Sequence, residues 1–211
     1  MTRQSVESFP YSTVNKIGFI AGYLNITLAG LRPDPVWMAQ IMRNNTESGT
    51  MSDFDGMLVQ SNLVAGLWSG ADSGATIPVL NPATGAVLGH VPDCGGNETN
   101  RAIEAATNAF RDWSRSNLLY RVGLLHKLHD ALMDNQEPLA QLLTAEQGKP
   151  LAEARGEIAI GAAYVRWFAE EVRRAKGEII PAPSADRRLF ATRHPVGVVG
   201  AITPWNFPSS M

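Results

Sequence analysis

The chain has 211 residues, of which 45% are hydrophobic and 18% are charged, as in ordinary soluble globular proteins. Its 18 basic and 20 acidic residues leave a formal charge of −2, so charge favours neither nucleic acid nor an anionic membrane as a partner. Cys94 is the single cysteine, which excludes an internal disulfide and is typical of a reducing compartment; we therefore expect a cytoplasmic protein.

The first 50 residues differ from the rest of the chain because they follow no sustained helical or strand period. We interpret residues 1–50 as an unstructured or spurious N-terminal extension, dispensable for folding, and Met51 as the start of the folded part. The apolar run Ile17–Leu31 is shorter than the ~20 residues that a membrane span needs. A secretory signal is the alternative, although no small-residue cleavage site follows the run.

Strand signals begin at Trp68. Two short apolar runs, 75–80 and 86–91, flank the sequence Asn81-Pro82-Ala83-Thr84-Gly85. Proline presets φ and glycine tolerates a positive φ, so this sequence favours a tight turn. The pattern predicts a β-hairpin.

Four helices are predicted after the hairpin. They are expected from a cap at Asn97 to Trp113, over 118–132, over Pro138–Glu146, and from Leu151 to a stop at Gly177. The last helix is long and amphipathic, which predicts an inner face against the core. That face is expected to comprise Leu151, Ile158, Ala162, Val165, Phe168 and Val172.

The last part of the chain predicts strands and a stiff loop. Residues 188–194 alternate like a half-exposed strand, and Val196–Ile202 is apolar enough for a strand covered on both faces of a parallel α/β sheet. The loop that follows presents Asn206 between prolines. Ligands collect at the carboxyl ends of strands in α/β folds, and an amide there can donate to a developing oxyanion. The alternative is a core strand that ends in an aromatic plug.

The run Ile202-Thr203-Pro204-Trp205-Asn206-Phe207-Pro208 resembles the signature of the aldehyde dehydrogenase superfamily, and the resemblance extends back to about Met51. The motifs Glu146-Gln147-Gly148-Lys149-Pro150-Leu151 and Trp167-Phe168-Ala169-Glu170-Glu171 are similar to those of its succinate-semialdehyde dehydrogenase branch. The resemblance implies an α/β fold of that family. Its parts would be 51–186 (N-terminal hairpin and helices), 187–195 (oligomerisation-hairpin strand) and 196–211 (first strand and loop of a Rossmann-like cofactor domain whose remainder is missing).

The resemblance also implies a reaction, namely the NAD(P)-dependent oxidation of succinate semialdehyde or a similar aldehyde to the acid. Asn206 would donate to the oxyanion, and the cofactor, NAD or NADP, would be bordered by Ile202, Thr203, Pro204, Trp205 and Asn206. The nucleophilic cysteine and the glutamate of the family would lie beyond Met211, so we expect this fragment to be inactive alone and the full-length enzyme to be a homo-oligomer. The alternative is a non-catalytic truncated paralogue that binds full-length subunits.

Three further groups of side chains have a functional and a plainer interpretation. His126 and His129 could share a helix face as ligands, but a solvated face is the simpler interpretation, and no metal is predicted. Arg173 and Arg174 could grip a substrate carboxylate or could interact with the dipole at a helix end. Cys94 precedes the first helix, where the resembled family has no nucleophile.

Overall fold

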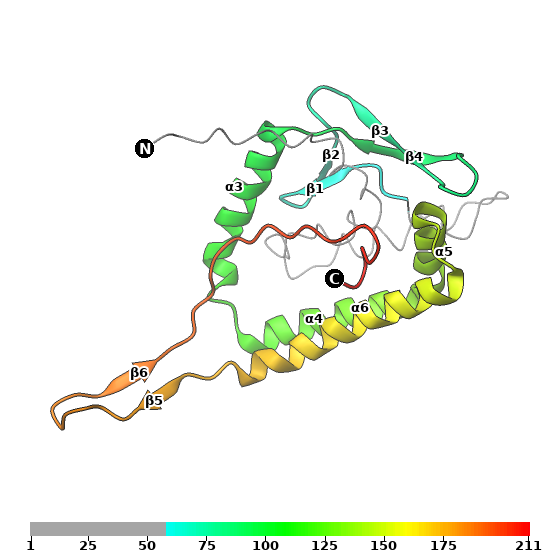
Figure 1. The fold of residues 1–211 in the computed structure, drawn as a ribbon. Helices are drawn as coiled ribbons and strands as arrows, with labels where there is room; N and C mark the ends of the chain where they lie inside the picture. The colour runs from blue at the N-terminus through cyan, green and yellow to red at the C-terminus, as the bar shows by residue number, and fades with distance from the viewer. Residues whose placement is uncertain (1–57) are drawn as a thin grey trace, which may run out of the picture.

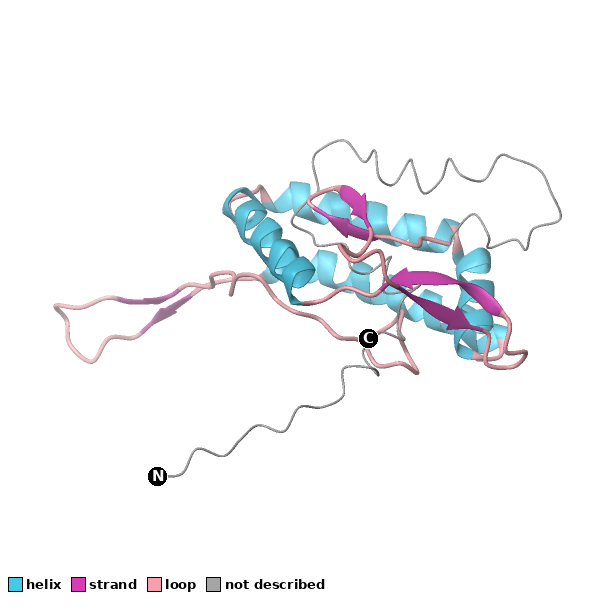
Figure 2. Cartoon of the chain, turned by 90° about the horizontal axis from the view of Figure 1, so that it is seen from above, coloured by secondary structure: helices cyan, strands magenta, loops and turns pink. Residues whose placement is uncertain are grey.

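The computed structural model describes residues 58–211, so the interpretation of residues 1–50 as an extension or a signal lies outside the described residues. In the described part, the two antiparallel hairpins formed by residues 62–92 lie above two long helices, and a third hairpin projects below them to one side (Figure 1). Seen from above, the hairpins formed by residues 62–92 lie over the helices, while a further hairpin extends away from the rest (Figure 2). None of the helices in this part of the chain combines the length and apolar character needed to cross a membrane.

The predicted hairpin is confirmed as β3 (Thr76–Leu80) paired antiparallel with β4 (Val87–Pro92). Asn81 explains the turn between them, since its Oδ1 accepts hydrogen bonds from the backbone N–H groups of Ala83 and Thr84 at 2.9 and 3.3 Å. Gly85 follows with a φ of 72°, which glycine adopts without strain. A second hairpin, β1 (Asn62–Val64) with β2 (Leu67–Ser69), starts before the strand signals that we recognised.

The first predicted helix is confirmed as α3 (Gly96–Trp113), but its expected cap, Asn97, is wrong. Asn97 lies inside the first turn, and the cap position is Gly95. Glu98 binds the start of the helix instead, because its carboxylate accepts from the backbone N–H of Gly95 at 3.0 Å. The same carboxylate accepts from the backbone N–H of Asp72 at 2.9 Å.

The other three helices are also confirmed. They are α4 (Leu118–Asp134), α5 (Gln136–Gln147) and α6 (Leu151–Glu171), the last continued by the 3₁₀ turn η4 (Val172–Arg174). The Asn117 side chain caps α4 by accepting from Leu119 N at 2.8 Å, and Gly148, at a φ of 82°, ends α5. Both α4 and α5 pack along α6.

The core lies where α5 meets α6, and its buried members are Leu139, Ala140, Leu142, Leu143, Ala154 and Ile158. The expected inner face of α6 is correct at Ile158 and Ala162 but wrong at Phe168, which is 59% exposed. Ala169 is buried in its place. Ala169 lies seven residues, about two helical turns, after the buried Ala162, whereas Phe168 lies six residues after Ala162 and faces another side of the helix.

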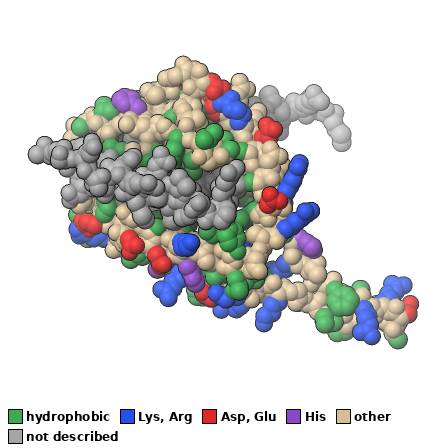
Figure 3. All heavy atoms as spheres, turned by 180° about the vertical axis from the view of Figure 1, so that it is seen from behind, with side chains coloured by type: hydrophobic (Ala, Val, Ile, Leu, Met, Phe, Trp, Pro, Cys, Tyr) green, Lys and Arg blue, Asp and Glu red, His purple; other side chains and the backbone are tan. Residues whose placement is uncertain are grey.

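Strand β6 (Leu189–Ala191) confirms the strand expected within residues 188–194, and it pairs antiparallel with the unexpected β5 (Glu178–Ile180). This β5–β6 hairpin projects from the molecule (Figure 1), and hydrophobic and basic side chains gather on it in Figure 3. Ile179 is 81% exposed and Phe190 is 64% exposed. The hairpin is therefore a projection held mainly by its own backbone pairing.

Residues 196–202, over which we expected the first strand of a larger domain, form no strand in this structure and are unpaired. Val196 is 92% exposed and Ile202 is 80% exposed. A strand needs a neighbour to satisfy its backbone donors and acceptors, and the pairs among residues 58–211 are β1–β2, β3–β4 and β5–β6 alone. The apolar composition of this segment is typical of a buried strand, but no strand among residues 58–211 pairs with it.

A surface ion pair between α5 and α6 gives a prediction for acid stability. Arg155 donates from Nε and Nη2 to the two carboxylate oxygens of Glu137 at 2.7 and 2.8 Å. The hydrogen bonds from Arg155 and then Gln141 lower the pKa of Glu137 from 4.5 to about 2. A depressed pKa means that this contribution to stability is present above pH 4.5 and is lost as the pH falls through about 2.

Glu137→Gln should therefore melt below the wild-type chain near neutral pH, and the difference in Tm should shrink as the pH falls from 4.5 toward 2. Thermal melts over a pH series measure this. Glu153→Gln, at an acidic position in the first turn of α6, is the matched control. A Tm difference that stays constant across that pH range would contradict the assignment.

Candidate functional site

Asn206 lies in a short loop that packs against α6. The loop is stabilised from within by a hydrogen bond that Phe207 N donates to Pro204 O at 3.3 Å. Pro208 is buried, whereas Asn206 is exposed. The loop touches α6 at Gly161, where a Cβ would lie 2.5 Å from the carbonyl oxygen of Ser209. The absence of a side chain at position 161 thus permits this close approach.

Two charged side chains are buried under the loop. Lys149 precedes α6 and Glu157 lies two turns into it, and their side chains are 7% and 1% exposed. They form an ion pair with each other. Lys149 and Glu157 are the buried polar residues among residues 58–211. Charged side chains are seldom buried unless they are paired, and here each of the two charges is buried beside the other.

The pair also binds the loop backbone at two points. Lys149 Nζ donates to the carbonyl oxygen of Asn206 at 2.8 Å, and the backbone N–H of Ser209 donates to Glu157 Oε1 at 2.9 Å. Lys149 Nζ also lies 4.1 Å from the centre of the Phe207 ring, within reach of a cation–π interaction. The residues between 206 and 209 are therefore held to α6 by buried, charge-assisted hydrogen bonds.

Sequence reasoning missed this pair. Lys149 was recognised only as a member of the motif Glu146-Gln147-Gly148-Lys149-Pro150-Leu151, with no role of its own. Glu157 offered the available signal, because it falls on the buried face of α6 next to Ile158, where an unpaired carboxylate would be costly. Its partners lie 8 and 52 residues away in the sequence, so only the tertiary structure identifies them.

The residues expected to border a cofactor form one continuous stretch with Asn206. Trp205 is 72% exposed, Pro204 is exposed and Thr203 is half-buried, and the exposed Ile202 precedes them. The stretch thus presents large apolar surfaces, a hydroxyl and an amide.

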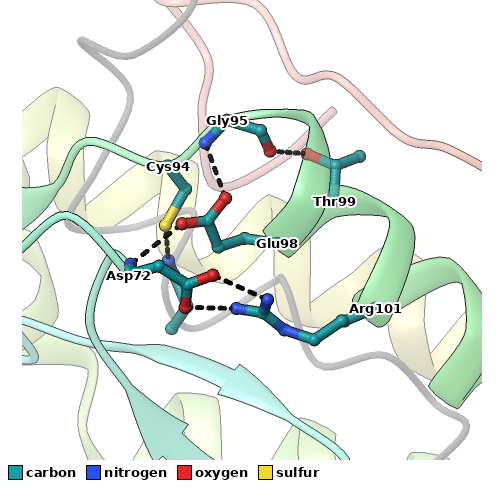
Figure 4. A network of polar contacts seen from close by, with 7 residues as sticks. Asp72, Cys94, Gly95, Glu98, Thr99 and Arg101 are labelled. Carbon is teal, nitrogen blue, oxygen red and sulfur yellow. Dashed lines mark hydrogen bonds and ion pairs between the residues drawn. The ribbon is translucent and has the colours of Figure 1, made fainter.

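Cys94 belongs to a polar network at the start of α3 (Figure 4). Its Sγ accepts a hydrogen bond from Asn62 Nδ2 at 3.0 Å. In the same network Arg101 binds both carboxylate oxygens of Asp72, at 2.7 and 2.6 Å. Burial raises the pKa of the Cys94 thiol, and the negative charge of Glu98 raises it further. A nucleophilic cysteine needs a lowered pKa, so this environment suits a structural thiol.

The two histidines of α4 bind different acidic partners. His126 Nε2 lies 3.0 Å from Glu170 Oε1, and His129 Nδ1 lies 2.9 Å from Asp130 Oδ1. Among residues 58–211 no three His, Cys, Asp or Glu side chains lie close enough together to hold a metal ion. The histidine spacing therefore corresponds to two separate polar contacts.

Arg173 and Arg174 are also engaged within their own helical segment. Arg173 Nε lies 3.1 Å from Glu170 Oε2, and Arg174 forms an ion pair with Glu171. Both contacts span three residues, the spacing at which side chains on a helix meet. The plainer interpretation, a charged helix end, describes these two side chains in this structure.

The described residues combine antiparallel hairpins, packed helices and the loop that carries Asn206, and comparison with known proteins identifies the family. The chain belongs to the aldehyde dehydrogenase family, whose model matches residues 68–211. It resembles the succinate-semialdehyde dehydrogenase branch, as its sequence motifs predicted.

Three relatives illustrate the similarity. The chain is 52% identical to 3-sulfolactaldehyde dehydrogenase of Pseudomonas putida over 155 residues, covering 74% of this chain and 32% of that protein. It is 47% identical to succinate-semialdehyde dehydrogenase [NADP(+)] of Escherichia coli over 152 residues, covering 72% and 32%. The crystal structure of succinate-semialdehyde dehydrogenase from Burkholderia pseudomallei matches with a TM-score of 0.74 and 47% identity, covering 77% of this chain and 34% of that one. The chain thus spans about a third of the length of these relatives.

Proposed function

We propose that this chain, completed to the length of its relatives, catalyses the NAD(P)-dependent oxidation of a small aldehyde to the carboxylic acid. The observation that supports this most directly is the loop of the family signature, whose backbone is held to α6 while Asn206 is exposed. Asn206 donates from its amide to the aldehyde oxygen as negative charge develops there. The cofactor, when bound, supplies the hydride acceptor.

We propose that the substrate carries an acidic group in addition to its aldehyde. The names of two relatives, which specify 3-sulfolactaldehyde and succinate semialdehyde, support this class. The cofactor is NAD or NADP, and the name of the Escherichia coli relative specifies NADP(+). Ile202, Thr203, Pro204 and Trp205 border the cofactor, with apolar surfaces for its ring and a hydroxyl for its polar edge.

We also propose that the protein is cytoplasmic and that it self-associates through the β5–β6 hairpin, whose Ile179 and Phe190 side chains are exposed. An unpaired apolar projection of this kind is typical of an interface with another chain. The alternative, a non-catalytic paralogue that binds full-length subunits, would use the same hairpin. The coding sequence after Met211 distinguishes the two: continuation into a cysteine-bearing segment favours the enzyme, and a stop codon favours the paralogue.

Residues 1–211 alone should not oxidise an aldehyde, because Cys94 is the single thiol and its pKa is raised rather than lowered. The measurement is NAD(P)H formation from succinate semialdehyde with purified chain and either cofactor. Cys94→Ser is the matched control and should behave like the wild-type chain. Reproducible NAD(P)H formation that Cys94→Ser abolishes would overturn this expectation.

A further inference from the structure

Lys149 and Glu157 bind backbone groups of the Asn206 loop in addition to each other. Each oxygen of the Glu157 carboxylate has a separate partner: Oε2 binds Lys149, and Oε1 accepts from Ser209 N at 2.9 Å. Lys149 Nζ is likewise shared between Glu157 and the Asn206 carbonyl, at 2.8 Å from the latter. The two charges and the two loop groups thus form one connected network under the loop.

The network fixes the backbone of the residue that presents the proposed oxyanion donor. The carbonyl that Lys149 binds belongs to Asn206 itself, and the amide that Glu157 binds lies three residues later, at Ser209. Between these points Phe207 lies against the Lys149 ammonium, and behind them Ser209 packs on Gly161. A shift of the pair would therefore move Asn206 relative to α6.

Stability alone does not explain a buried ion pair at this place. Well-packed apolar side chains of similar size are often equally good or better for stability than a buried pair. Apolar side chains could not, however, bind the Asn206 carbonyl and the Ser209 amide, which would then lose these partners. The charges are suited to holding two backbone groups of a loop in one position.

We propose that Lys149 and Glu157 are positioning residues that hold the Asn206 amide in the geometry needed to donate to the oxyanion. This inference rests on the proposed function. Lys149 and Glu157 act through the loop backbone and do not touch the aldehyde. Because a displacement of about 1 Å at a reacting group can cost about 10²-fold in rate, a loosened loop should lower kcat without abolishing binding.

The test replaces both charges at once, so that neither is left buried without a partner. In the protein completed to the length of its relatives, Lys149→Met/Glu157→Met should lower kcat roughly 10- to 100-fold while KM changes little. Glu137→Met/Arg155→Met is the matched control, since that pair joins α5 and α6 at the surface and should leave kcat unchanged. In the chain 1–211, hydrogen exchange at the Ser209 amide should accelerate in Lys149→Met/Glu157→Met and not in the control.

Combining these substitutions with Asn206→Ala distinguishes a positioning role from a general loss of structure. Adding Asn206→Ala to Lys149→Met/Glu157→Met should lower kcat little beyond Asn206→Ala alone, because the pair acts only through that amide. If the fold-losses in kcat of Asn206→Ala and of Lys149→Met/Glu157→Met instead multiply in the combined variant, the positioning role is overturned. If the double variant does not fold, Glu157→Gln is measured instead: it keeps an acceptor for Ser209, and a several-fold loss of kcat is expected, whereas a wild-type kcat would overturn the inference.

The outcomes also separate this inference from the proposed function. If Asn206→Ala has a wild-type kcat, the oxyanion role of Asn206 fails, and the positioning role fails with it. If Asn206→Ala is impaired but Lys149→Met/Glu157→Met has a wild-type kcat, the proposed function stands and the positioning inference alone is overturned.

Discussion

Asn206→Ala should lower the kcat of the completed enzyme by about 10²–10³-fold, the usual cost of removing one oxyanion donor. The hydrogen bond strengthens as the aldehyde oxygen gains negative charge, so it stabilises the transition state more than the bound substrate. The loss should therefore appear in kcat and much less in the binding of substrate or cofactor. Steady-state kinetics with succinate semialdehyde measure both effects.

Stability should be nearly unchanged in this variant. Lys149 binds the backbone carbonyl of Asn206 at 2.8 Å, and alanine retains that carbonyl. The Asn206 side chain is exposed, so its truncation leaves no cavity in the core. The Tm and the cofactor affinity of the same preparation are therefore the necessary controls.

Asn206→Asp should be at least as damaging as Asn206→Ala, because a carboxylate at this position would repel the oxyanion. A kcat close to that of the wild type in Asn206→Ala would refute the oxyanion role. A loss of rate fully accounted for by unfolding would do the same, since it would make Asn206 a loop residue with a structural role.

The helical part of this fold follows from local signals, which is why sequence predicted it. Apolar side chains at steps of three and four residues mark α4 and α6, and Gly148 ends α5 by its own chemistry. Even so, position 168 was assigned to the wrong face of α6. Each residue turns a helix by about 100°, so Phe168, six residues after the buried Ala162, lies about 120° away from it around the helix.

Strand pairing is not local, and the sequence was a weaker guide to it. The β3–β4 hairpin was predictable because Asn81 and Gly85 form a turn that brings its strands together. The β5–β6 hairpin joins strands on either side of a longer loop, and β5 was missed. Val196–Ile202 has the composition of a buried strand, yet the described residues offer it no partner.

In the candidate site too, the residue in a continuous motif was recognised and the residues with distant partners were not. Asn206 was recognisable because its motif is continuous along the chain. Lys149 and Glu157 were not recognised, because the groups that they bind lie 57 and 52 residues away from them. A charged residue on an apolar helix face, such as Glu157 beside Ile158, is the one sequence feature that could have prompted a search for a buried partner.

The largest effect on stability is expected from Lys149→Met as a single change. It leaves Glu157, whose side chain is 1% exposed, as a buried carboxylate without its cation. Breaking a buried pair from one side typically costs about 3–5 kcal/mol, because the remaining charge keeps its desolvation penalty and loses its partner. The free energy of unfolding of the chain 1–211, from urea titration, should fall by about that amount.

Removing the second charge should reverse part of this loss. Lys149→Met/Glu157→Met buries two apolar side chains of similar length, so the remaining deficit should reflect only the two backbone hydrogen bonds to the loop, about 1 kcal/mol each. Salt should change the effect of Lys149→Met little, since buried charges are poorly screened. If Lys149→Met lowers the free energy of unfolding by less than about 1 kcal/mol, the buried Glu157 carboxylate does not carry the cost assigned to it. The double variant would then show no recovery of stability.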